Sequence, residues 1–129
     1  MLPVIRYVVW AGLFCTAAAA QTEPVSHYLL RMEPVRQDLT PQNLTEAEHA
    51  VIAKHAVYLQ SLIQQGKLTL AGQALDPNGF WGIIIVNASG AEAATAILNG
   101  DPAVQAKIFR GRVIPFRIVY FATPSGSNP

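Results

Sequence analysis

The chain has 129 residues, of which 51% are hydrophobic and 13% are charged, and its formal net charge is +1. This length suits one compact domain, and the composition excludes an intrinsically disordered chain, which is rich in charged and polar residues. The sequence has no cluster of Lys and Arg that would indicate a nucleic-acid-binding protein, and its single cysteine cannot form an internal disulfide.

The first twenty residues have the layout of a signal peptide. Arg6 and the amino terminus supply positive charge, residues 7–14 are mostly apolar, and Ala18 and Ala20 place small side chains before a cleavage site. We predict cleavage after Ala20 and hence a secreted or periplasmic protein with no membrane association after cleavage. An uncleaved membrane anchor is the alternative. Cleavage would remove Arg6 and Cys15, leaving a formal charge of 0 and no cysteine.

The rest of the chain is predicted to form one α+β domain over residues 21–122, followed by a flexible tail over residues 123–129. Residues 25–32 have the length and composition of a strand, and a polar, proline-containing loop is expected over residues 33–43.

A long amphipathic helix follows this loop. Thr45 and Glu48 form a capping-box pattern at its start, and Gly66 is placed to end it in a left-handed conformation. Neither Gly nor Pro interrupts the segment between them. Its expected apolar stripe consists of residues three and four positions apart, namely Val51, Ile52, His55, Tyr58, Leu59, Leu62 and Ile63.

A β-hairpin is predicted next. Residues 68–75 alternate in polarity, residues 80–86 are almost entirely apolar, and residues 76–79 between them have strong turn chemistry. Alternation is expected to put one set of side chains of the first strand on a common face, namely Leu68, Leu70, Gly72 and Ala74.

The last part of the domain is predicted to hold two helical segments and a strand. A helix over residues 91–98 is expected to bury Ala94, Ile97 and Leu98. Asp101 then has the features of an N-cap for a third, short helix with Pro102 at its first position. Residues 112–121 alternate as a strand, and Pro115 favours an edge position because proline cannot donate to a neighbouring strand.

The predicted order of strand, helix, strand, strand, helix, strand indicates an α+β, ferredoxin-like βαββαβ fold. Its four-stranded antiparallel sheet would carry both main helices on one face and leave the other face uncovered. Because residues 80–86 are apolar on both sides, we expect two copies to pack face to face as a homodimer.

Several short segments carry a resemblance to a known family. They are His55-Ala56-Val57-Tyr58-Leu59, Gly66-Lys67-Leu68 with Ala71-Gly72, and Asp101-Pro102-Ala103-Val104. In their order and spacing the chain resembles the YCII-related (YciI-like) domain family over about residues 26–120. The resemblance implies a dimeric α+β barrel and a His/Asp pair in a cleft, proposed as catalytic, which corresponds here to His55 and Asp101. The export signal departs from a family known mostly as cytoplasmic proteins.

The residues themselves leave two interpretations of this pair open. His55 lies on the apolar stripe of the long helix, where it is either a core histidine satisfied by hydrogen bonds or a general acid/base. Imidazole has an ordinary pKa of about 6.5 and can therefore transfer protons near neutral pH. Asp101 is either only a helix cap or also the partner that orients the imidazole, since one carboxylate has two oxygens.

Two further residues are candidates for ligand binding. Tyr58 lies one turn from His55 and is either a packing residue or a donor to a bound anion, and Gly72 permits close approach of a ligand or a helix. Arg110, Arg112 and Arg117 bind a carboxylate or form a solvated edge. No pair of histidines has i, i+4 spacing, so no metal is expected, and no nucleotide-binding motif is evident, so no cofactor is expected either.

Together these features predict an exported small-molecule enzyme that uses a His/Asp pair for cofactor-free acid/base chemistry, either isomerase-like or lyase-like, in a small cleft. The alternative is a non-catalytic ligand-binding or interaction module of the cell envelope, in which the pair is structural. The substrate is not encoded in any motif of the sequence.

Overall fold

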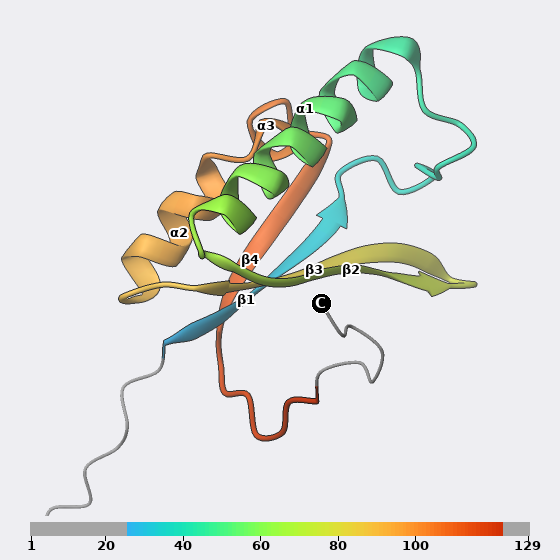
Figure 1. Ribbon diagram of the computed structural model, residues 1–129. Coiled ribbons are helices and arrows are strands. Elements are labelled where there is room, and N and C mark those ends of the chain that lie inside the picture. Colours follow the sequence, from blue (N-terminus) through green and yellow to red (C-terminus); the bar gives the residue numbers. More distant parts are fainter. Residues whose placement is uncertain (1–25, 123–129) are drawn as a thin grey trace, which may run out of the picture.

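The computed structural model describes residues 26–122, which form a four-stranded antiparallel sheet with helices on one face (Figure 1). The chain runs in the order β1 (His27–Pro34), α1 (Glu46–Gln64), β2 (Leu68–Asp76), β3 (Gly79–Asn87), α2 (Ala91–Asn99), α3 (Pro102–Gln105) and β4 (Phe109–Phe116). The strand order β2-β3-β1-β4 confirms the predicted ferredoxin-like fold. The predicted signal peptide and tail lie outside the described residues.

Helix α1 begins and ends as its sequence predicts. The Thr45 hydroxyl accepts from the Glu48 amide at 3.2 Å, and the Glu48 carboxylate accepts from the Thr45 amide at 2.8 Å, so the capping box is complete. Gly66 has φ +67°, the left-handed conformation expected after the last turn. The predicted stripe is wrong at its end, because Leu62 is buried whereas Ile63 is exposed to solvent.

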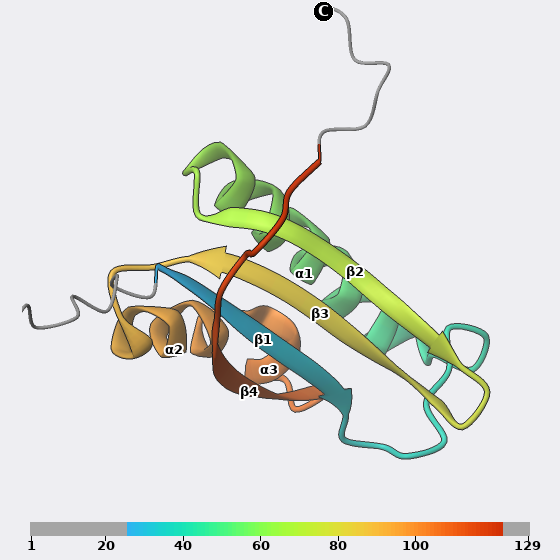
Figure 2. The same cartoon turned by 90° about the horizontal axis from the view of Figure 1, so that it is seen from below.

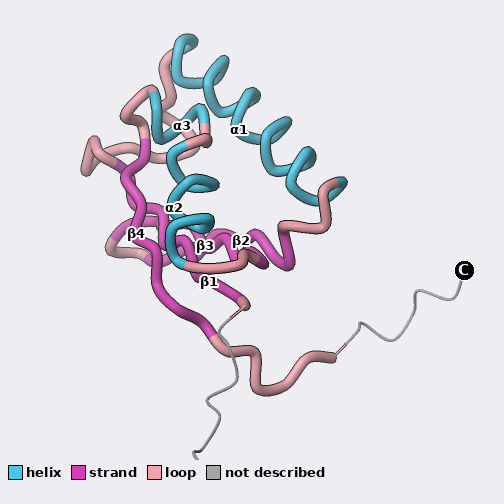
Figure 3. The backbone as a smooth tube through the Cα atoms, turned by 90° about the vertical axis from the view of Figure 1, so that its left-hand side faces the viewer, coloured by secondary structure: helices cyan, strands magenta, loops and turns pink. Residues whose placement is uncertain are grey.

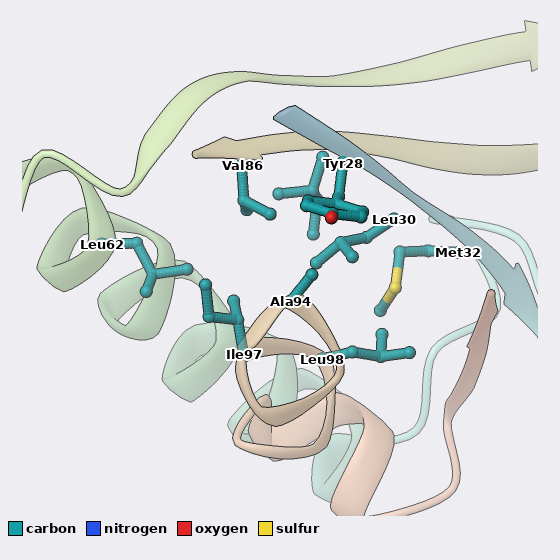
Figure 4. Close-up of a cluster of buried hydrophobic side chains, with 9 residues drawn as sticks. Tyr28, Leu30, Met32, Leu62, Val86, Ala94, Ile97 and Leu98 are labelled. Atoms are coloured by element: carbon teal, nitrogen blue, oxygen red, sulfur yellow. The ribbon is translucent and has the colours of Figure 1, made fainter. Parts of the chain in front are cut away.

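The core lies between the sheet and the helices (Figure 4). Alternate residues of β1 and β3 point toward the helices, and α2 contributes the three residues predicted to be buried. The buried cluster consists of Tyr28, Leu30, Met32, Leu62, Ile84, Val86, Ala94, Ile97 and Leu98. This cluster fixes the distance of α1 and α2 from the sheet, and with it the space that remains between them.

Two strand predictions needed correction. Strand β4 covers Phe109–Phe116 rather than residues 112–121, because its register with β1 pairs Phe116 with His27, the first residue of that strand. Pro115 does lie on an edge strand, as predicted. In β2 an irregularity between Leu68 and Leu70 breaks the alternation: Leu68 pairs with the buried Val86, and Leu70 pairs with the adjacent residue of β3, on the opposite face.

No helix covers the face of the sheet opposite the helices, and only the segment after β4 crosses it among the described residues (Figure 2). A row of aliphatic side chains crosses this face in register, with Leu70 on β2, Ile85 on β3, Leu29 on β1 and Ile114 on β4. The segment after β4 runs beneath this face, on the side of the strands away from the helices (Figure 3). Its residues Val119, Tyr120 and Phe121 expose their side chains to solvent.

Candidate active site

The structure brings His55 of α1 and Asp101 together. The Nδ1 atom of His55 lies 2.7 Å from Oδ2 and 2.9 Å from Oδ1 of Asp101. The imidazole is 17% exposed and the carboxylate is 2% exposed, so the pair is shielded from water on the Asp101 side. Because a carboxylate oxygen only accepts, Nδ1 carries the hydrogen and donates it, which leaves Nε2 as the acceptor of the neutral ring.

Asp101 is also the N-cap of α3. Its Oδ1 atom accepts from the backbone amide of Ala103 at 2.8 Å, and Pro102 occupies the first helical position. The two expected roles of this carboxylate therefore coexist. A buried carboxylate needs donors to offset its lost hydration, and here it receives them from a helix end and from the imidazole. Both donors also hold its position, and through it the orientation of the His55 ring.

A cavity of about 440 Å³ lies beside this pair, between α1 and the part of the sheet formed mainly by β2 and β3. His55 is part of its wall, and Asp101 stands behind the imidazole and outside the lining. Most of the remaining wall is apolar, formed by Met32, Leu39, Pro41, Leu44, Ile52, Leu59, Ala71, Gly72, Phe80, Gly82, Ile83, Ile84 and Phe109, with Gln73 at β2. The arrangement suits a small organic molecule.

The loop between β1 and α1 closes one side of the cavity. Leu39 is only 3% exposed, although it stands in a stretch that its polar residues and prolines mark as a loop. Arg36 fixes this loop to the helix start through a hydrogen bond of 3.0 Å to Glu48 Oε2, and it also contacts Asp38. The Thr45 amide and the Arg36 guanidinium hold the pKa of Glu48 below its ordinary value.

Aromatic rings stand next to the imidazole. The Phe109 ring lies 6.2 Å from the His55 ring, and Phe80 meets Phe109 edge-on at 6.2 Å. The sequence placed Phe80 at the start of the apolar strand predicted over residues 80–86, and it indicated no role for Phe109, Leu39 or Gln73. The one local signal that pointed to this wall was Leu39, an isolated large apolar residue in a polar loop.

Of the two residues expected to bind a ligand, the structure brings only Gly72 to the cavity. The Tyr58 hydroxyl instead donates to the carbonyl of Ile97 at 2.7 Å, and its ring packs against the core. Burial, together with the neighbouring Asp101 carboxylate, raises the pKa of Tyr58 above its ordinary 10.0. We therefore assign Tyr58 to holding α2 against α1, next to the loop that presents Asp101.

The profile of the YCII-related domain family matches residues 28–117, which include all of the sheet except His27, together with α1 and the His55–Asp101 pair. The chain belongs to the YCII-related family. This YCII-related protein is similar in structure to a 5-chloro-2-hydroxyhydroquinone dehydrochlorinase from Burkholderia phenoliruptrix AC1100, solved in complex with 2,5-dihydroxybenzoquinone. The TM-score is 0.54 at 18% identity, over 70% of this chain and 93% of that one. No curated protein matches this chain.

The remaining histidines of the YCII-related protein lie away from the cavity. Nδ1 of His27 is 3.0 Å from the Ser26 hydroxyl, and His49 is exposed on α1. Within residues 26–122 no three His, Cys, Asp or Glu side chains are grouped as a metal site requires. No helix in that part of the chain is both long and apolar enough to cross a bilayer.

Proposed function

We propose that this YCII-related protein is a small-molecule enzyme that uses His55 as general acid/base and Asp101 as its orienting partner, without a cofactor. The observation that carries the proposal is the Nδ1–Oδ2 distance of 2.7 Å, with the imidazole in the wall of an otherwise mostly apolar cavity. A purely structural histidine needs hydrogen-bond partners but no empty space beside it. The cavity supplies room for a reacting molecule next to the ring.

The geometry supports an isomerase-like or lyase-like reaction. In either case Nε2 of His55 takes a proton from a carbon of the substrate, and the electron pair of that C–H bond forms a new double bond. In an elimination a leaving group departs with the pair of its own bond, whereas in an isomerisation the proton returns to another atom. Asp101 stabilises the imidazolium that exists between the two transfers.

The similarity to the dehydrochlorinase supports the class of substrate. That protein was solved in complex with a dihydroxybenzoquinone, which is an oxygenated six-membered ring. The apolar cavity of this YCII-related protein, with Phe80 and Phe109 in its wall, suits a ring of this kind. We therefore propose a small oxygenated ring compound as substrate.

The catalytic proposal is tested by incubating the protein with 2-hydroxyhydroquinone in D2O under nitrogen. The rate at which the ring C–H protons exchange for deuterium is measured from the loss of their signals in proton NMR. The wild type is expected to accelerate exchange, and His55→Gln to lower the acceleration by about 100-fold. His49→Gln, on the exposed side of the same helix, is the matched control and keeps the wild-type rate. No acceleration by the wild type, or equal acceleration by His55→Gln, contradicts the proposal.

The competing function is a non-catalytic ligand-binding or interaction module, and the uncovered sheet face favours it. On either function we propose that this face joins two copies as a homodimer, since the aligned row from Leu70 to Ile114 needs an apolar partner surface. Sedimentation equilibrium is expected to give a dimer for the wild type and a folded monomer for Ile85→Lys. A monomeric wild type at 50 μM, about the range in which such interfaces hold, contradicts the dimer.

We also propose export through the segment ending at Ala20, on the strength of its charge and apolar pattern. Mass spectrometry of the protein expressed in a host with a secretory pathway is expected to find a chain that begins at Gln21. A mature protein that begins at Met1 contradicts this proposal and favours the uncleaved anchor.

A further inference from the structure

The lining of the cavity contains very few groups that can form hydrogen bonds. Among its described lining residues, His55 and Gln73 are the ones whose side chains carry nitrogen or oxygen. No Lys, Arg, Asp or Glu belongs to this lining. A ligand that fills the cavity therefore meets hydrogen-bonding side chains at two positions, and any other polar group on it must turn to solvent or to backbone.

These two side chains come from opposite walls. His55 projects from α1, which lies above the sheet, and Gln73 belongs to β2, the edge strand beneath it (Figure 1). After the irregularity in β2, Gln73 pairs with Gly82 and falls on the helix-facing side, in step with Ala71, which pairs with the buried Ile84. A ligand between the walls is thus approached by one polar group from each side.

The residue opposite Gln73 leaves space for a ligand. A Cβ atom at Gly82 would lie 3.2 Å from the Cβ of Met32 and 3.9 Å from the carbonyl oxygen of Gly72. Glycine at this position avoids this crowding and leaves the cavity wall beside Gln73 without a side chain. Both Gly72 and Gly82 are part of the cavity lining.

The carboxamide of Gln73 is free to bind a ligand. Within residues 26–122 it forms no side-chain hydrogen bond, whereas the carboxamide of Asn43 is occupied by the Asp38 carbonyl and the Thr40 amide. A primary amide offers a donor and an acceptor, so it recognises a hydroxyl or a carbonyl without adding charge. Gln73 is itself exposed, so a ligand carboxylate at the same place would keep part of its hydration but would meet no Lys or Arg of the lining.

We propose that Gln73 is a specificity-determining residue of this cavity. It selects ring compounds that carry a neutral hydroxyl or carbonyl on the edge of the ring opposite the reacting edge. This inference rests on the proposed function of the cavity. The reacting edge of the ring faces His55, and the opposite oxygen bonds to the Gln73 carboxamide. Phe80 and Phe109 contact the ring itself. The affinity for a ligand then depends on oxygens at both ends of its ring, whereas proton transfer depends on the His55–Asp101 pair.

Three probe compounds test this inference. Hydroquinone has a hydroxyl at each end of its ring, and phenol has a single hydroxyl at one end. 4-Hydroxybenzoate has a hydroxyl at one end and a carboxylate at the opposite end. Their dissociation constants are measured by NMR titration under nitrogen. Wild type is expected to bind hydroquinone about three- to tenfold more tightly than phenol, the net effect of one hydrogen bond, and 4-hydroxybenzoate most weakly. Gln73→Leu is expected to bind hydroquinone and phenol within about twofold of each other.

Gln60→Leu, an exposed position on α1 outside the cavity lining, is the control and keeps the wild-type preference. If Gln73→Leu retains the full preference for hydroquinone while the probes shift the His55 resonances, the Gln73 inference is overturned and the proposed function stands. If the preference depends on Gln73 but His55→Gln leaves proton exchange unchanged, the inference stands for a binding module and the catalytic role falls. No binding of any probe overturns both.

Discussion

His55 and Asp101 are 46 positions apart in the sequence, and their side chains meet with Nδ1 at 2.7 Å from Oδ2. The carboxylate that orients the imidazole also caps α3, so one buried group links the helix start to the ring. The cap and the charge are separable by mutation, because asparagine is as good an N-cap as aspartate but carries no charge.

The free energy of unfolding of Asp101→Asn, measured in urea, is expected to lie within about 1 kcal/mol of the wild-type value. The proton-exchange rate of this variant is expected to be lower by at least about tenfold. Asp101→Ala, which removes the cap as well, is expected to lose about 1 kcal/mol more. Long-range ¹H–¹⁵N spectra should show the His55 proton on Nδ1 in the wild type and a mixture of tautomers in Asp101→Asn. A full exchange rate in Asp101→Asn would refute the orienting role.

Tyr58→Phe removes the hydroxyl that donates to the Ile97 carbonyl and keeps the packed ring. We expect a loss of about 1 kcal/mol in the free energy of unfolding, measured by urea denaturation at pH 7. Tyr120→Phe is the control, since the Tyr120 side chain is 94% exposed and should change nothing measurable. Equal stability of Tyr58→Phe and wild type would show that this hydrogen bond does not hold α2 in place.

Glu48 predicts a pH dependence of stability. The pKa of Glu48 in the folded protein lies below its ordinary 4.5, so its ionised carboxylate stabilises the fold. This stabilisation is complete above pH 4.5 and is lost as the pH falls through the lower pKa of the folded state. Glu48→Gln keeps the capping-box geometry without the charge. The melting temperature of wild type should exceed that of Glu48→Gln at pH 7, and the difference should shrink at pH 3.

Glu46→Gln provides the comparison, because this acidic residue of the same first turn has no salt-bridge partner within the described residues. Its melting temperature should differ little from the wild-type value at either pH. A constant gap between wild type and Glu48→Gln from pH 7 to pH 3 would rule out the charge of Glu48, which the Thr45 amide and Arg36 stabilise, as its cause.

Leu39→Ala tests whether the β1–α1 loop is a packed wall of the cavity. Leu39 is 3% exposed, so removing its side chain is expected to cost about 2–3 kcal/mol in unfolding free energy and to weaken hydroquinone binding. Val35→Ala, at an exposed apolar position of the same loop, should cost less than about 0.5 kcal/mol. Similar small losses in both variants would mean that the loop does not depend on Leu39 for its place.

The elements with local causes were predictable from the sequence. The capping box at Thr45 and Glu48, the left-handed Gly66 and the Asp101–Pro102 helix start all depend on hydrogen bonds or dihedral angles within a few residues. The strand and helix order followed from periodicity, and the family resemblance pointed to His55 and Asp101. That these two side chains meet could not follow from spacing alone, since they stand on separate helices.

The end of β4 and the surroundings of His55 depend on contacts between distant segments and not on local sequence. The alternating pattern continues beyond Phe116, but a strand lasts only as long as its neighbour supplies hydrogen bonds, and β1 begins at His27. Likewise nothing local to Gln73 marks it as part of the cavity, and Leu39 stands out only as an apolar residue in a polar loop, because the cavity wall comes from a loop, a helix and all the strands of the sheet. Short-range hydrogen bonds and hydrophobic periodicity depend on residues close together in the sequence and can be predicted from it. A cavity forms only when distant segments pack together.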